Sequence, residues 1–150
     1  MASSSARTAT RPLGAVSHAI YSTLLPIPIV CFIGALLTDI AYSRTADMMW
    51  LDFASWLLLA GLIGGGFAGA VLLVVLIRVG RGRTGALTAH FVLLLAAWIT
   101  EMFNSFIHAR DGWTAVVPTG MMLSIAATVL SLLAGWFWQS ANGPRIGDAR

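Results

Sequence analysis

The chain has 150 residues, of which 58% are hydrophobic and only 10% charged, and its mean hydropathy is +0.84. A soluble domain carries about 25% charged residues, so this composition excludes an ordinary soluble enzyme or binding domain. In a soluble chain the net charge of +3 and the pI of about 10.0 would suggest nucleic-acid binding, but membrane topology explains both here and no nucleic-acid partner is expected.

Four long apolar segments follow one another along the chain, at 24–41, 53–77, 86–107 and 116–138. A helix of about 20 apolar residues crosses a hydrocarbon core of roughly 30 Å. Short connections between such helices favour antiparallel neighbours. The sequence therefore predicts an all-α protein, a single up-down-up-down bundle of four transmembrane helices at 14–139. We expect a disordered tail at 1–13 and a second tail at 140–150.

The basic residues predict the orientation of this bundle. All nine are arginines, and seven lie before the first segment, between the second and third, or after the fourth: Arg7, Arg11, Arg78, Arg81, Arg83, Arg145 and Arg150. Only Arg44 and Arg110 lie on the opposite side. The positive-inside rule then places both termini and both tails in the cytoplasm. We expect a multi-pass protein of the bacterial cytoplasmic (inner) membrane, with the lipid bilayer as its main surroundings.

The first helix is expected to begin between residues 14 and 18 and to end near Tyr42. Pro26 and Pro28 remove two backbone donors, which predicts a kink in the cytoplasmic third of this helix. The first outer loop is predicted at 43–52.

Small residues recur at helical spacing in the second and fourth segments. In lipid, helices associate through close packing of such small residues and through hydrogen bonds between helices. We therefore predict two helix-packing faces, formed by Gly61, Gly65 and Gly69 and by Ser124, Thr128 and Ser131.

Polar residues of the third segment share one helical face. His90, Leu94, Ala97, Glu101, Asn104 and His108 follow at steps of four, three, four, three and four. Asp39 of the first segment lies at a depth similar to that of Glu101, which predicts a polar cluster of Asp39, Glu101, Asn104 and His108 in the outer half of the bundle. Such groups either satisfy one another and fix helix packing, or form a proton or ion site built on Asp39 and Glu101.

Two histidines define a different candidate site in the inner half. His18 and His90 each follow the last cytoplasmic arginine by seven residues, which suggests equal depth and axial ligation of a b-type haem. Counting from the outer arginines instead gives a depth mismatch of about 9 Å. The sequence therefore leaves two possibilities, a bound b-type haem or no cofactor.

Motifs for self-sufficient catalysis are missing from the chain. It has no zinc-protease helix, no haem-attachment motif and no nucleotide loop, and its single cysteine, Cys31, cannot form an internal disulfide or a thiolate metal cluster. We expect neither a self-sufficient enzyme nor a metal site.

Short stretches in all four segments resemble one family of bacterial membrane proteins. They lie at 18–21, 26–28, 35–42, 55–61, 89–90, 118–124 and 134–136. Residues from about 17 to 138 as a whole resemble domain-of-unknown-function family 2231. Its members typically open the first helix with His-Pro-x-His-Pro, where this chain has Ala19 for the first proline and Tyr21 for the second histidine.

The resemblance implies a four-span fold and implies that His18, Asp39 and His90 belong to the family pattern. It implies no established activity. Members sometimes accompany redox modules such as Rieske-type domains, whereas the loss of the second histidine at Tyr21 weakens a haem or metal site in this chain.

These observations lead to one expected function and two alternatives. We expect a non-catalytic membrane subunit or anchor that serves a redox or respiratory partner or associates with itself. The first alternative is a proton- or ion-handling protein that uses Asp39 and Glu101. The second is an electron-transfer subunit with b-type haem ligated by His18 and His90.

Overall fold

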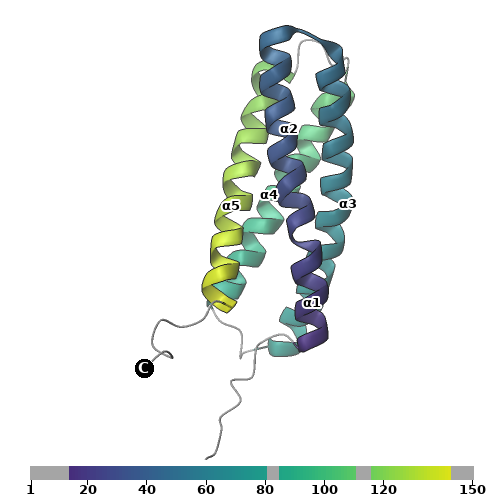
Figure 1. The fold of residues 1–150 in the computed structure, drawn as a ribbon. Helices are drawn as coiled ribbons and strands as arrows, with labels where there is room; N and C mark the ends of the chain where they lie inside the picture. Colours follow the sequence, from purple (N-terminus) through teal and green to yellow (C-terminus); the bar gives the residue numbers. More distant parts are fainter. Residues whose placement is uncertain (1–13, 81–84, 111–115, 143–150) are drawn as a thin grey trace, which may run out of the picture.

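The computed structural model describes residues 14–80, 85–110 and 116–142, and the regular structure in these ranges is entirely helical (Figure 1). The elements are α1 (Ala15–Leu24), α2 (Pro26–Thr45), α3 (Met48–Val79), α4 (Gly85–Ala109), the π-helical turn η2 (Val116–Gly120) and α5 (Met121–Asn142). The tail predicted at 1–13 lies outside the described residues. Of the tail predicted at 140–150, the described residues 140–142 form the end of α5.

Within the described residues, four helical segments are long and apolar enough to cross a membrane: Val16–Thr45, Met48–Val79, Gly85–Ala109 and Val116–Ser140. Helices α2 and α3, α3 and α4, α4 and α5, and α2 and α5 pack against one another, which closes the bundle. In Figure 1 the start of α1 and the end of α5 lie at the same end of the bundle, and the α2–α3 turn lies at the other. The predicted all-α bundle of four long apolar helices is confirmed.

The first span is interrupted at Leu25, between α1 and α2. Pro26 and Pro28 lack the N–H groups that would bond to the carbonyl groups of Ser22 and Leu24 in an uninterrupted helix. Leu25 keeps helical dihedral angles, and its N–H donates to Tyr21 O at 2.9 Å. The missing hydrogen bonds divide the span into α1 and α2 while its backbone stays helical at Leu25, and the predicted kink stays a prediction.

The α2–α3 turn is much shorter than the loop predicted at 43–52, so that prediction is wrong. α2 continues to Thr45, Ala46 adopts a left-handed conformation with φ 54°, and α3 begins at Met48. Asp47 caps α3, because its carboxylate accepts a hydrogen bond of 3.0 Å from Met49 N. The polar residues on both sides of this turn are exposed at helix ends, where polarity does not require a loop.

The outer surface of the bundle is as apolar as its interior. Large hydrophobic side chains are exposed along every span, among them Val30, Trp56, Phe67, Val92 and Trp136. A soluble monomer rarely exposes apolar patches of this extent. Polar side chains such as Asp39, His90 and Glu101 are instead fully buried between the helices. This distribution is the one expected of helices surrounded by lipid.

Glycines of α3 allow the neighbouring helices to approach closely. A Cβ on Gly61 would lie 2.5 Å from Phe32 Cε1, and one on Gly65 would lie 2.9 Å from Trp98 Cδ1. Gly64, which the predicted face did not include, is equally close, because its Cβ would lie 2.5 Å from Ile27 Cγ2. A Cβ on Gly69 would meet nothing within 4 Å, and this glycine lines an apolar groove of about 220 Å³ between α3 and α4.

Candidate functional site

The buried polar side chains of the bundle form two separate groups. The first, which we call the carboxyl network, comprises Asp39 of α2, Glu101, Asn104 and His108 of α4, and Ser124 of α5. The second, which we call the aromatic layer, comprises His18 and Tyr21 of α1, His90 of α4 and Trp138 of α5. The carboxyl network lies toward the α2–α3 turn, and the aromatic layer lies toward the opposite end of the bundle.

Hydrogen bonds connect the carboxyl network into one continuous chain across three helices. His108 Nε2 lies 2.9 Å from Asp39 Oδ1. Ser124 Oγ donates to Asp39 Oδ2 at 2.6 Å and accepts from Asn104 Nδ2 at 2.8 Å. Asn104 Nδ2 also donates to Glu101 Oε2 at 2.8 Å. Both carboxyl groups therefore belong to the same chain, although they lie on different helices.

The partners of His108 define where its protons lie. Its Nδ1 is 3.0 Å from the carbonyl oxygen of Asn104, which can only accept, so Nδ1 carries a hydrogen. One further proton is then shared between His108 Nε2 and Asp39 Oδ1, and the pair is neutral overall whichever of the two atoms holds it. The side chains of His108 and Asp39 are 2% and 0% exposed, so this pair is shielded from solvent.

Two oxygen atoms of the carboxyl network have no partner among the described residues. They are Glu101 Oε1 and Asn104 Oδ1, and both are fully buried. Gly120 lies directly beside the second, because a Cβ on this glycine would be 3.2 Å from Asn104 Oδ1 and 3.3 Å from His108 Cε1. Buried acceptors without a donor are rare in proteins and call for a physical explanation.

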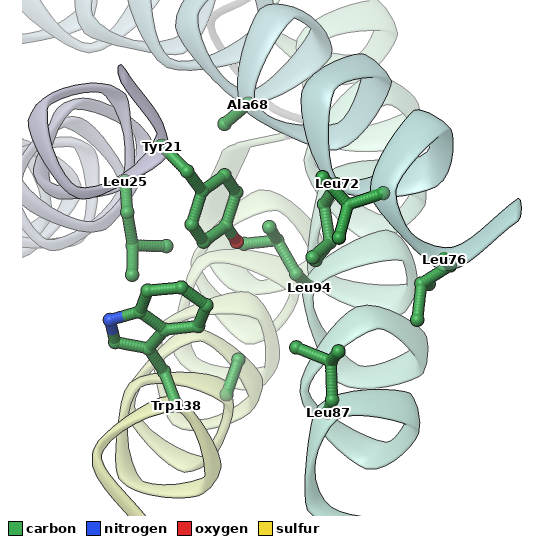
Figure 2. Packing of buried hydrophobic residues seen from close by; sticks show 10 residues of the cluster. Tyr21, Leu25, Ala68, Leu72, Leu76, Leu87, Leu94 and Trp138 are labelled. Carbon is green, nitrogen blue, oxygen red and sulfur yellow. The ribbon is translucent and has the colours of Figure 1, made fainter. Parts of the chain in front are cut away.

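In the aromatic layer, His90 uses both of its ring nitrogens within the bundle. Nδ1 donates to the carbonyl oxygen of Ala134 at 2.6 Å, so Nε2 of the neutral ring accepts from the hydroxyl group of Tyr21. Figure 2 shows Tyr21 from α1 beside Trp138 from α5, and their ring centroids are 4.6 Å apart. Trp138 also contacts His18, with centroids 5.5 Å apart, and His90, with centroids 5.3 Å apart.

This arrangement does not fit a b-type haem held by His18 and His90. Axial ligation needs a free nitrogen on each imidazole facing one iron. Both nitrogens of His90 are engaged in hydrogen bonds to Ala134 and Tyr21, and the Trp138 ring contacts both imidazole rings.

Two hydroxyl groups of α5 lie between the two polar groups. Thr128 Oγ1 is 3.5 Å from Phe32 O, and Ser131 Oγ is buried without a partner among the described residues. Ser124, predicted with them as a packing residue, belongs to the carboxyl network. In the described part of the chain, no group of three or more His, Cys, Asp or Glu side chains is placed to hold a metal ion.

The membrane fold agrees with a comparison with known protein families. Residues 17–142 match the family model described as predicted membrane protein (DUF2231). The chain belongs to this family. The match extends from α1 to the end of α5, so both polar groups lie inside the family domain. No curated protein and no solved structure matches the chain.

Proposed function

We propose that this protein handles protons within the membrane, and that the carboxyl network is the site where a proton is taken up and released. The observation that carries this proposal is the continuous hydrogen-bonded chain from Asp39 to Glu101. Ionisable groups within membrane spans are costly and often belong to proton relays. Carboxyl and imidazole groups are the components from which such relays are built.

The charges of the network support exchange of a proton. It holds two carboxyl groups but one imidazole, and that imidazole is paired with Asp39. Glu101 has only the Asn104 amide as a hydrogen-bond partner among the described residues, and its other oxygen has none. A lone carboxylate in this apolar surrounding is expensive, whereas its protonated form is neutral. Glu101 is therefore the group that we expect to bind and release the proton.

We further propose that the network lies in the outer half of a bacterial cytoplasmic membrane, with both chain termini in the cytoplasm. The placement of the arginines supports this orientation, because Arg78 marks the end of the bundle opposite to the network. His108, one residue before the end of α4, would then lie nearest to the outer surface.

Proton flux through the purified protein in liposomes tests the function. An imposed pH gradient should decay faster with the native protein than in empty liposomes, and Glu101→Gln should abolish the difference. Asp52→Asn is the matched control, because Asp52 is an exposed carboxyl group of α3 outside the network, and it should retain the native flux. Equal fluxes in native protein, Glu101→Gln and empty liposomes would contradict the proposal.

The alternative is a non-catalytic membrane subunit or anchor for a redox or respiratory partner. The observation that favours it is the aromatic layer, in which His90 of α4 forms hydrogen bonds to Tyr21 of α1 and Ala134 of α5. These bonds connect three helices through uncharged groups, as a structural role requires. A partner that copurifies after mild detergent extraction, together with a complete absence of flux, would favour this function.

A further inference from the structure

The two unpartnered oxygens of the carboxyl network belong to groups that already contact each other. Asn104 Nδ2 donates to Glu101 Oε2 at 2.8 Å, so one hydrogen bond already joins the amide group to the carboxyl group. Asn104 Oδ1 and Glu101 Oε1 are the remaining oxygens of these two groups. Both are acceptors when Glu101 is ionised, and both are fully buried. Two buried acceptors with no donor, on groups already joined by one hydrogen bond, are an unfavourable arrangement that one additional hydrogen between them would correct.

The orientation of the Asn104 amide is fixed by its neighbours. Ser124 gives its hydrogen to Asp39 Oδ2 at 2.6 Å, so Ser124 Oγ can only accept from Asn104. If the amide nitrogen and oxygen were exchanged, Asn104 Oδ1 would face Ser124 Oγ and Glu101 Oε2, which are both acceptors in this arrangement. The nitrogen must therefore point toward Ser124 and Glu101, which leaves the amide oxygen available as an acceptor.

We propose that Glu101 and Asn104 form a cyclic acid–amide pair that binds one proton at Glu101 Oε1 and donates it to Asn104 Oδ1. Asn104 Nδ2–H donates to Glu101 Oε2, and Glu101 Oε1–H donates back to the same amide group. One proton thus gives a partner to both oxygens. This inference rests on the proposed function and specifies the atoms at which the proton is held.

In the described part of the chain, no arginine pairs with Glu101, so the acid–amide pair has no competing cation there. On α4 and α2 the charged neighbours are His108 and Asp39, which are paired with each other at 2.9 Å. α5 contributes the hydroxyl group of Ser124, which accepts from Asn104, and η2 contributes the apolar residues Val116 and Gly120, the second of them beside Asn104 Oδ1. The buried residues in the first half of α3 are apolar as well: Leu51, Ala54 and Leu58.

Release of the proton has a structural consequence. The Oε1–H bond breaks, its electron pair remains on Oε1, and the proton passes to a water molecule. Asn104 Oδ1 and Glu101 Oε1 then lose the hydrogen that they shared, while Asn104 Nδ2 still donates to Glu101 Oε2 and to Ser124 Oγ. The Asn104 amide therefore keeps its orientation, and release removes one hydrogen bond from the network. Ser124, which accepts from Asn104 and donates to Asp39, joins the acid–amide pair to the Asp39–His108 pair.

Infrared spectroscopy of the full-length protein in liposomes tests the acid–amide pair. We expect the C=O band of a protonated, hydrogen-bonded carboxylic acid in the native protein. The band should be lost in Glu101→Gln, be shifted in Asn104→Ala, and remain in the control Asp52→Asn. Absence of the band from the native protein would overturn the proposal. Loss of the band on replacing choline chloride with sodium chloride would also overturn it, because Glu101 would then be a carboxylate that binds sodium.

A stability measurement keeps the test informative if Asn104→Ala does not fold. The side-chain amide that Glu101→Gln introduces can donate to Asn104 Oδ1 as the protonated acid does, so this variant should melt at or above the native temperature. A large loss of stability would contradict a neutral donor at this position. If the band is present but no proton flux is measured, the acid–amide pair is supported and the proposed proton-handling function is contradicted. If proton flux is measured without the band, the acid–amide pair is contradicted and the proton-handling function is not.

Discussion

The carboxyl network and the aromatic layer both place polar side chains between the helices, but the hydrogen bonds of these side chains are completed in different ways. In the aromatic layer a neutral imidazole accepts from Tyr21 and donates to a backbone carbonyl group, so every atom of the His90 ring that can form a hydrogen bond does so. In the carboxyl network five residues still leave two oxygens without partners among the described residues. The hydrogen bonding of His90 is complete as it stands, whereas the carboxyl network needs one more proton.

This difference is the reason why we propose the carboxyl network, and not the aromatic layer, as the chemically active group. Both nitrogens of His90 already have neutral partners, so a proton added there would be a buried charge without compensation. A site with one unmatched carboxyl group changes its hydrogen bonds whenever that group gains or loses a proton. Three substitutions test the comparison, beginning with the largest expected effect.

Asp39→Ala should lower the free energy of unfolding by about 3 kcal/mol, because it leaves His108 Nε2 and the hydroxyl group of Ser124 buried without their partner. Denaturation with sodium dodecyl sulfate in mixed micelles measures this change. Asp52→Ala removes an exposed carboxyl group of the neighbouring helix and should change stability by less than about 0.5 kcal/mol. Equal effects in both variants would show that the network contributes no particular stability.

Gly120→Ala should destabilise the protein by about 2 kcal/mol and disturb the carboxyl network, since the new Cβ would lie 3.2 Å from Asn104 Oδ1 and 3.3 Å from His108 Cε1. Gly135→Ala is the matched change near the aromatic layer. Its Cβ would be 3.8 Å from Ile29 Cδ1, which is an ordinary contact, and alanine favours the helix by about 0.5 kcal/mol. Thermal melting in detergent compares the two, and a reversed order would argue against the tight packing around Asn104.

Tyr21→Phe should cost about 1 kcal/mol, because the ring still packs on Trp138 while His90 Nε2 loses its donor. Thr23→Val on the same helix removes an exposed hydroxyl group that bonds to Ala19 O, and should have a smaller effect. Proton flux should remain native in both variants, since the aromatic layer lies outside the proposed site. A loss of flux in Tyr21→Phe would mean that the two polar groups are functionally connected.

Much of the fold can be predicted from hydropathy, because 18 or more apolar residues in a row leave few alternatives to a transmembrane helix. The shared face of the third span is also readable, since residues at steps of three and four lie on one side of a helix. His90, Leu94, Ala97, Glu101 and Asn104 are all buried on α4. The turn at residues 46–47 is shorter than predicted, because polarity marks helix ends and loops alike.

The partners across helices cannot be predicted in the same way. The sequence pattern indicates a packing role for Ser124, although its hydroxyl group joins Asp39 to Asn104. In the sequence, Tyr21 stands out only because it replaces a histidine of the family pattern. In the structure, its hydroxyl group donates to His90 Nε2. Such pairs depend on how far each helix is rotated and shifted against its neighbour, and a one-residue change of register turns a side chain by about 100°. A single amino-acid sequence does not specify this rotation and shift directly.

The length of α3 has a consequence for how the protein sits in lipid. Its 32 residues make a rod of about 48 Å, longer than a hydrocarbon layer of roughly 30 Å. The helix must tilt or extend into the headgroup region, and a thinner bilayer demands more tilt. Because α3 packs along α2 and α4, its inclination also sets how deeply Asp39 and Glu101 are immersed. We therefore expect lipid chain length to adjust the depth of the proposed proton site without any change of sequence.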